Sequence, residues 1–215
     1  IYLKNLDNET PFPNVKRLKI SGDGIKTIQI SNTMFPNVRE IISTNPKYPS
    51  GSILVEKAGN NMHLLNAFCL NEDEPLDLSG IVAIRDDALV GCKSDKVINT
   101  EDVIWVSTDA FKASSMACMK KPFVDGVRMV GSIACDFDTD AKKYIIPENA
   151  TTMATFYDFN RDATMIINRN CSFFANTPYS PPNHLVFTNT DHMDEQDLRY
   201  LKKYDAEIRN DHNQK

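Results

Sequence analysis

The chain has 215 residues, of which 41% are hydrophobic and 25% charged, a composition typical of folded proteins and not of disordered ones. Its formal net charge of −5 and its scattered lysines and arginines argue against the clustered basic surface that nucleic-acid binding requires, so we expect no nucleic-acid partner. No apolar run reaches the roughly 18 to 20 residues that cross a bilayer as a helix, so we expect no membrane span.

Two similar runs near the N-terminus define a sequence repeat. FPNVKRLKI begins at Phe12 and FPNVREIIS begins at Phe35, 23 residues later. In the first run, Leu18 and Ile20 alternate with polar residues at the period of a strand, and residues 21–24 follow as a turn. A repeat of about 20 to 29 residues is typical of a solenoid, whose coils stack and share one core.

The repeat is interrupted and then resumes. Residues 44–75 are predicted to form an irregular insertion that contains the turn-rich segment TNPKYPSG and the acidic segment NEDEP. After it come four pairs of apolar residues three positions apart, which we expect to be buried between coils: Ile81/Ile84, Val103/Val106, Val127/Val130 and Ala150/Met153. We also expect close coil packing at Ala88, Ala110 and Ala134.

The C-terminal part repeats less clearly. Three further strands are predicted, at Tyr144–Ile146, in TMIIN from Thr164 and in HLVF from His184. Residues 191–209 are predicted to form a helical cap, because apolar residues recur there at helical spacing after an acidic first turn. A solenoid needs such a cover over its last coil. We therefore predict a single domain over residues 1–215, with repeats over 12–188 and the cap over 191–209.

No recognised catalytic or metal-binding motif is present. None of the four histidines belongs to an H-E-x-x-H motif, and there is no G-x-S-x-G elbow or glycine-rich phosphate loop. The D-x-D-x-D run at residues 136–140 opens like a calcium loop, but Ala141 and Pro147 stand where an EF-hand needs Gly and Glu. His192 lies among acidic residues that we interpret as a solvated helix start: Asp191, Asp194 and Glu195.

We therefore expect no enzyme, no catalytic residues, no cofactor and no metal. Two alternatives stay open: a looser carboxylate site at residues 136–140, and an enzyme built on the repeat frame.

The cysteines and the sequons carry little functional information. The five cysteines show no C-x-x-C spacing, and their odd number argues against a closed disulfide framework. We expect most of them to be small buried hydrophobic residues, with one disulfide left open. N-x-[ST] sequons occur at Asn8, Asn149 and Asn170, and this composition produces roughly two or three by chance, so they carry almost no information about glycosylation.

Aromatic residues are the best candidates for a binding surface. Trp105 lies between the apolar residues Val103 and Val106, so it is predicted to point outward from a buried pair. Exposed aromatic side chains are favoured anchors of interfaces. We therefore propose Trp105, Phe156, Tyr157 and Phe159 as binding residues, and the alternative for each is packing in the core or at a sheet edge.

Two short segments carry a resemblance to a known family. Ala88-Leu89-Val90-Gly91-Cys92 and Ala110-Phe111-Lys112-Ala113-Ser114 share the pattern A-[FL]-x-x-[CS], a few residues after an apolar pair. This pattern resembles the BspA-type leucine-rich repeats of bacterial and protozoan surface proteins. The sequence departs from it in the 44–75 insertion, at Asp95, which occupies a Leu position, and after residue 134.

The resemblance implies a leucine-rich-repeat solenoid that is mostly β, with short helical or 3₁₀ connectors. It also implies a non-enzymatic module, at the cell surface or secreted, that binds a protein or a glycan through a curved face. The alternative function is an intracellular protein-interaction scaffold in the cytoplasm.

Overall fold

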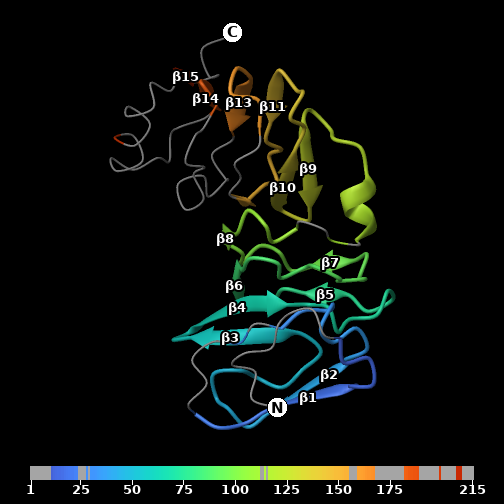
Figure 1. Ribbon diagram of the computed structural model, residues 1–215. Coiled ribbons are helices and arrows are strands. Elements are labelled where there is room, and N and C mark those ends of the chain that lie inside the picture. Colours follow the sequence, from blue (N-terminus) through green and yellow to red (C-terminus); the bar gives the residue numbers. More distant parts are fainter. Residues whose placement is uncertain are drawn as a thin grey trace. The chain divides into compact units, whose positions relative to one another are not determined.

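The computed structural model describes residues 11–23, 28, 30–111, 114, 116–154, 159–167, 182–188, 199 and 207–209. Within them the chain folds as a β-solenoid of short strands with almost no helix, so the predicted solenoid is confirmed (Figure 1). Contacts divide the chain into two compact units. Unit 1 comprises Ile1–Asp102 and Asp109–Lys120, and unit 2 comprises Val103–Thr108 and Lys121–Lys215.

The first two strands of unit 1 reproduce the sequence repeat. Strand β1 (Arg17–Ile20) pairs in parallel with β2 (Glu40–Ser43), and Arg17 lies opposite Glu40, 23 residues on. The rings of Phe12 and Phe35, which open the two runs, stack with their centroids 5.5 Å apart. Equivalent residues of successive coils therefore lie one above the other, which is why the sequence repeats at this interval.

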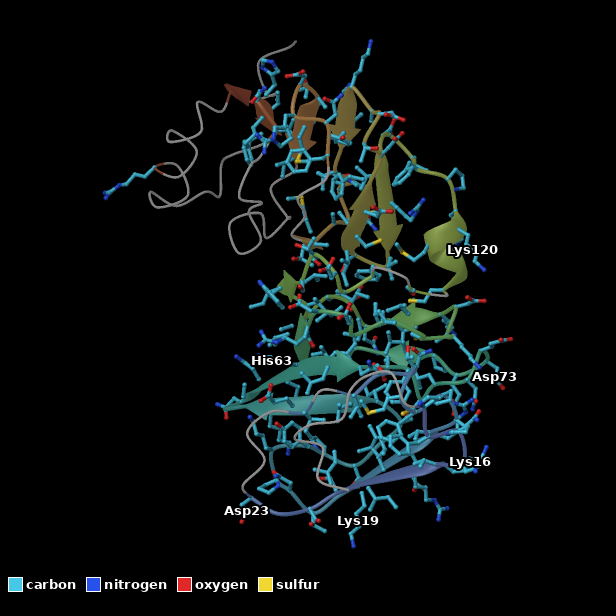
Figure 2. The ribbon with its side chains drawn as sticks, viewed as in Figure 1. Lys16, Lys19, Asp23, His63, Asp73 and Lys120 are labelled. Carbon is cyan, nitrogen blue, oxygen red and sulfur yellow. The ribbon has the colours of Figure 1, made fainter. Side chains whose placement is uncertain are left out.

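The outer face of β1 and β2 is charged. The guanidinium of Arg17 lies 2.6 Å from the carboxylate of Glu40, and Lys19 lies opposite Ile42. Lys16 and Lys19 are exposed and project away from the strands (Figure 2). Because Leu18 is partly buried and Ile20 and Ile41 are buried, the alternation predicted for this strand region separates a core face from a solvent face.

The remaining elements of unit 1 include a hairpin. Strands β3 (Leu54–Ala58) and β4 (Asn61–Asn66) pair antiparallel within the segment 44–75, which the sequence had predicted to be irregular. Parallel pairing then resumes between β4 and β6 and between β5 and β7. The other elements are β5 (Leu76–Asp77), β6 (Ile81–Ile84), β7 (Val97–Ile98) and the 3₁₀ helix η2 (Ala117–Lys120).

Unit 2 contains a parallel sheet preceded by a hairpin. The antiparallel β9–β10 hairpin carries β12 in parallel, and β11, β13, β14 and β15 form a four-stranded parallel sheet (Figure 1). The bounds are β8 (Trp105–Val106), β9 (Val127–Val130), β10 (Ile133–Phe137), β11 (Lys143–Ile145), β12 (Thr152–Met153), β13 (Thr164–Ile167), β14 (His184–Thr188) and β15 (Glu207–Arg209).

The prediction of a C-terminal helix over residues 191–209 is wrong for its last three residues. Residues 207–209 form β15, which pairs in parallel with β14, Val186 lying opposite Glu207. The open backbone of β14 accepts one more strand there, and this tertiary pairing overrides the helical spacing that we read from Leu198 to Ile208. Arg199 is helical, and the rest of the predicted cap over 191–206 lies outside the described residues.

The predicted core pairs are confirmed. Both members of all four apolar pairs are at most 3% exposed, and Ala88, Ala110 and Ala134 are fully buried. Close packing of successive coils follows from the small side chain: the backbone N–H of Leu89 donates to the carbonyl of Ala110 at 3.1 Å. Residues that share a phase in the repeat therefore share a position in the core.

Asparagine side chains connect neighbouring coils, and we call this set the bridging asparagines. Each donates its side-chain amide to an acceptor 19 to 36 residues away in the same unit. The pairs are Asn37 to Pro13, Asn45 to Gly22, Asn66 to Ile30, Asn99 to Asp77, Asn160 to Ala141 and Asn183 to Asp162. These bonds satisfy polar groups at the corners, where backbone pairing between the strands ends.

The buried apolar pairs allow a direct test of the stack. Val106→Asp should lower the free energy of unfolding by about 3 kcal/mol or more, because it places an unpaired carboxylate at a fully buried position. Ile104→Asp is the matched control: Ile104 is 51% exposed, so its change should stay within about 0.5 kcal/mol. Urea unfolding followed by circular dichroism measures both. Equal midpoints for the two variants would contradict the buried placement of Val106.

Substitutions at two turn glycines distinguish the cost of a strained backbone from the additional cost of steric crowding. Gly91 has a φ of 73°, and a Cβ there would lie 2.8 Å from the Cβ of Asn32 and would clash with its side-chain amide. Gly59 has a φ of 66° with nothing within 4 Å. Both Gly→Ala variants strain the backbone by about 1–2 kcal/mol, and Gly91→Ala should lose about 1–3 kcal/mol more through overpacking. Thermal unfolding of the two variants measures this difference, and its absence would refute the close contact with Asn32.

Candidate functional site

An exposed apolar pair lies at the start of unit 2, and we call Ile104 and Trp105 the recognition pair. Ile104 is 51% exposed and Trp105 is partly exposed, whereas the flanking Val103 and Val106 are fully buried. The hydroxyl of Thr152 donates to the carbonyl of Ile104 at 3.3 Å, and Val106 pairs in parallel with Ala154. The backbone of the pair is therefore held on the coil of β12, while its side chains reach solvent.

Three large aliphatic side chains of the described residues are prominently exposed: Ile42 at 37%, Ile104 at 51% and Val124 at 69%. Val124 also follows an aromatic residue, but the guanidinium of Arg128 lies over the ring of Phe123, 4.1 Å from its centroid. Ile104 instead adjoins the only tryptophan of the chain. Since tryptophan is the residue type most enriched among interface anchors, the recognition pair is the stronger candidate.

The four aromatic residues proposed from the sequence do not occupy equivalent places. Trp105 lies on β8 and is partly exposed, and its outward direction stays a prediction. Phe159 is 9% exposed and packs edge-on against Tyr144, with ring centroids 6.5 Å apart, so it contributes to the aromatic core of unit 2. Phe156 and Tyr157 lie outside the described residues.

A second apolar row crosses the parallel sheet of unit 2. Ile145, Ile166 and Val186 lie in register on β11, β13 and β14, on the face opposite to the fully buried Met165 and Ile167. The sequence signal for this row is the consecutive apolar residues of these strands, which are typical of strands covered on both faces. Val186 is only 7% exposed, so the row is much less accessible than Ile104.

The acidic run at residues 136–140 is occupied by structural contacts. The carboxylate of Asp136 forms an ion pair with Arg128, and a carboxylate oxygen of Asp138 accepts from the N–H of Asp140 at 3.0 Å. Within the described part of the chain, no group of three or more His, Cys, Asp and Glu residues is placed to hold a metal ion. His192 and its acidic neighbours lie outside that part.

A polar network links β5 with the turn after β7. The Ser79 hydroxyl donates to the carboxylate of Asp77 at 2.6 Å, and the Asn99 amide donates to the same oxygen at 3.0 Å. The Ser79 hydroxyl bond, followed by the Asn99 bond, lowers the pKa of Asp77 below its ordinary value. A carboxylate held ionised by bonds between coils suits a structural role and does not suit proton transfer.

The described cysteines confirm the predicted packing role. Cys69, Cys92 and Cys135 are all buried. Burial raises the pKa of the Cys69 thiol from 9.0 to about 12, because the ionised form would lose its solvation. A thiol that stays protonated at neutral pH is a poor nucleophile, so Cys69 belongs to the core and not to a reactive site.

Comparison with known proteins gives no relative: no protein-family model, curated protein or solved structure matches the chain. In the ranges that the structure describes, no helix combines the length and the apolar character that crossing a bilayer requires. The recognition pair is therefore identified by its own geometry. Trp105 was predicted from the sequence, whereas Ile104 was missed, although its apolar type at a non-core position of the repeat was a usable signal.

The raised pKa of Cys69 predicts its chemical reactivity. Cys69 should resist alkylation by iodoacetamide at pH 8 in the folded protein and react readily in urea, which peptide-resolved mass spectrometry measures. Because the unfolded thiol ionises first, folding stability from this group is complete below pH 9 and decreases as pH rises toward about 12. Rapid labelling of Cys69 in the native protein at pH 8 would contradict its burial.

Proposed function

We propose that the chain is a non-enzymatic recognition module that binds a protein or glycan ligand through its repeat surface, at a cell surface or after secretion. The recognition pair carries this proposal. The flanking Val103 and Val106 are fully buried, whereas Ile104 is 51% exposed beside the chain's only tryptophan. Covering apolar surface is favourable by about 25 cal/mol per Å², so a partner gains affinity by burying this pair.

The same proposal assigns the solenoid to the BspA-type leucine-rich repeats. The alanines of the two A-[FL]-x-x-[CS] segments, Ala88 and Ala110, are both fully buried, and the N–H of Leu89 bonds to the carbonyl of Ala110. That contact supports stacking of the motif on itself, as a repeat motif requires. Solenoids of this kind offer extended surfaces for partners, which supports recognition as the function.

Two other functions make different predictions. An intracellular scaffold in the cytoplasm would keep all five cysteines reduced, so their redox state in the natural protein discriminates it from a secreted module. An enzyme built on the repeat frame would need a site with reactive groups. Calorimetric titration with divalent metals tests the carboxylates at residues 136–140 and 191–195, and tight stoichiometric binding would favour the enzyme.

The recognition pair predicts which substitutions weaken ligand binding. A glycan array and a pull-down from cell surfaces identify the ligand of the unmodified chain. Trp105→Ala should then weaken its affinity by about 30-fold, the loss typical of an interface anchor, and Ile104→Ser should weaken it by about tenfold. Val124→Ser is the matched control, since it removes an exposed aliphatic side chain elsewhere in unit 2.

Trp105 also provides a fluorescence signal that reports ligand binding. As the chain's only tryptophan, it makes intrinsic emission report on this position alone, and ligand binding should change that emission in proportion to saturation. If Trp105→Ala and Ile104→Ser bind as tightly as the unmodified chain, and the ligand leaves the emission of the unmodified chain unchanged, recognition lies elsewhere on the molecule.

A further inference from the structure

Among the described asparagines, the bridging asparagines and Asn149 are held differently. The bridging asparagines donate their side-chain amides to neighbouring coils and could not be enlarged without breaking those bonds. Asn149 differs from them. It is exposed, it lies in the turn between β11 and β12, and its side-chain amide makes no hydrogen bond to the described part of the chain.

The turn that carries Asn149 is fixed on both sides. The N–H of Ala150 donates to the carbonyl of Pro147 at 2.9 Å, which closes the turn, and Ala150 itself is fully buried. The N–H of Thr151 then donates to the carbonyl of Ser132 at 2.9 Å, and its hydroxyl donates to the Ser132 hydroxyl at 2.8 Å. The core therefore anchors the residues beside Asn149 and leaves its side chain in solvent.

We propose that Asn149 is a site of N-linked glycosylation, an inference that rests on the cell-surface or secreted location of the proposed function. Asn149-Ala150-Thr151 is the described asparagine-containing segment that fits the acceptor pattern N-x-[ST] with no proline at the middle position. The co-substrate is an oligosaccharide carried on a lipid pyrophosphate. The side-chain nitrogen of Asn149 forms a bond to the anomeric carbon, the bond from that carbon to the pyrophosphate breaks, and the nitrogen loses one proton.

The folded structure accommodates this modification without rearrangement. A glycan on the exposed amide of Asn149 displaces no hydrogen bond of the described residues, whereas one on Asn45, which is 5% exposed and bonds to Gly22, would prevent the coils from closing. Asn45 is followed by Pro46 and Lys47 and is therefore no acceptor. What the structure adds at Asn149 is that a glycan attached before folding can be carried by the folded chain, because the side chain is exposed and its amide is not engaged by the described residues. The sequons at Asn8 and Asn170 lie outside the described residues.

The site is tested on the full chain placed behind a secretion signal and translated in the presence of endoplasmic-reticulum microsomes. Asn8→Gln and Asn170→Gln are introduced so that the sequon at Asn149 alone remains. Chains protected from added protease should gain the mass of one oligosaccharide, which peptide N-glycosidase removes. Asn149→Gln and Thr151→Val should abolish this gain, and Thr151→Ser should retain it. Because transfer occurs during translocation, the result does not depend on how stably a variant folds.

Protease-protected chains that keep the unmodified mass would overturn the proposal. So would site-resolved mass spectrometry that finds Asn149 unmodified in the full chain secreted from eukaryotic cells. Neither result bears on the recognition pair, because the affinity and Trp105 emission are measured on the unglycosylated chain. If the microsome and secretion experiments find no glycan at Asn149 while the unglycosylated chain binds its ligand, this inference is refuted and the proposed function is retained. A glycan at Asn149 together with no ligand binding has the opposite meaning.

Discussion

The structure depends on one constraint: residues that are equivalent in successive coils must lie in register, one above the other. Strands β1 and β2 show it most simply, since Arg17 lies opposite Glu40 at the interval of the sequence repeat. Parallel pairing satisfies the backbone between coils, and the inward side chains of each unit form its core. A coil of this length cannot bury its own apolar edge, so a charge at Val106 or a methyl group at Gly91 disturbs the packing of the unit that contains it.

Register also explains where polar residues are used. At corners, where the ladder of backbone bonds ends, the bridging asparagines and the Asp77–Ser79–Asn99 network link one coil to the next. Those groups face acceptors and donors of the same chain, so they are not available for substrate chemistry. The buried, protonated thiol of Cys69 and the Arg128–Asp136 ion pair are likewise engaged. These contacts therefore stabilise the stacked coils.

Two exposed features of unit 2 carry the proposals made for this protein, and both depend on the same supporting coil. Thr152 holds the carbonyl of Ile104 beneath the recognition pair, and Asn149 stands three residues earlier on the turn that leads into β12. In both cases hydrogen bonds of the backbone fix the segment, and Ile104 and Asn149 are exposed on it. This is the arrangement expected when binding or modification is added to a repeat frame whose stability lies in its interior.

The sequence by itself determined the solenoid and the four buried apolar pairs, because these follow from spacing along one coil. It did not determine the β3–β4 hairpin within 44–75 or the strand at 207–209, since both depend on which backbone edges are free to pair. The exposure of Ile104, the core position of Phe159 and the unengaged amide of Asn149 were likewise decided by tertiary structure. Periodicity shows which residues share a phase, but only the packed coils show which of them meet a neighbour.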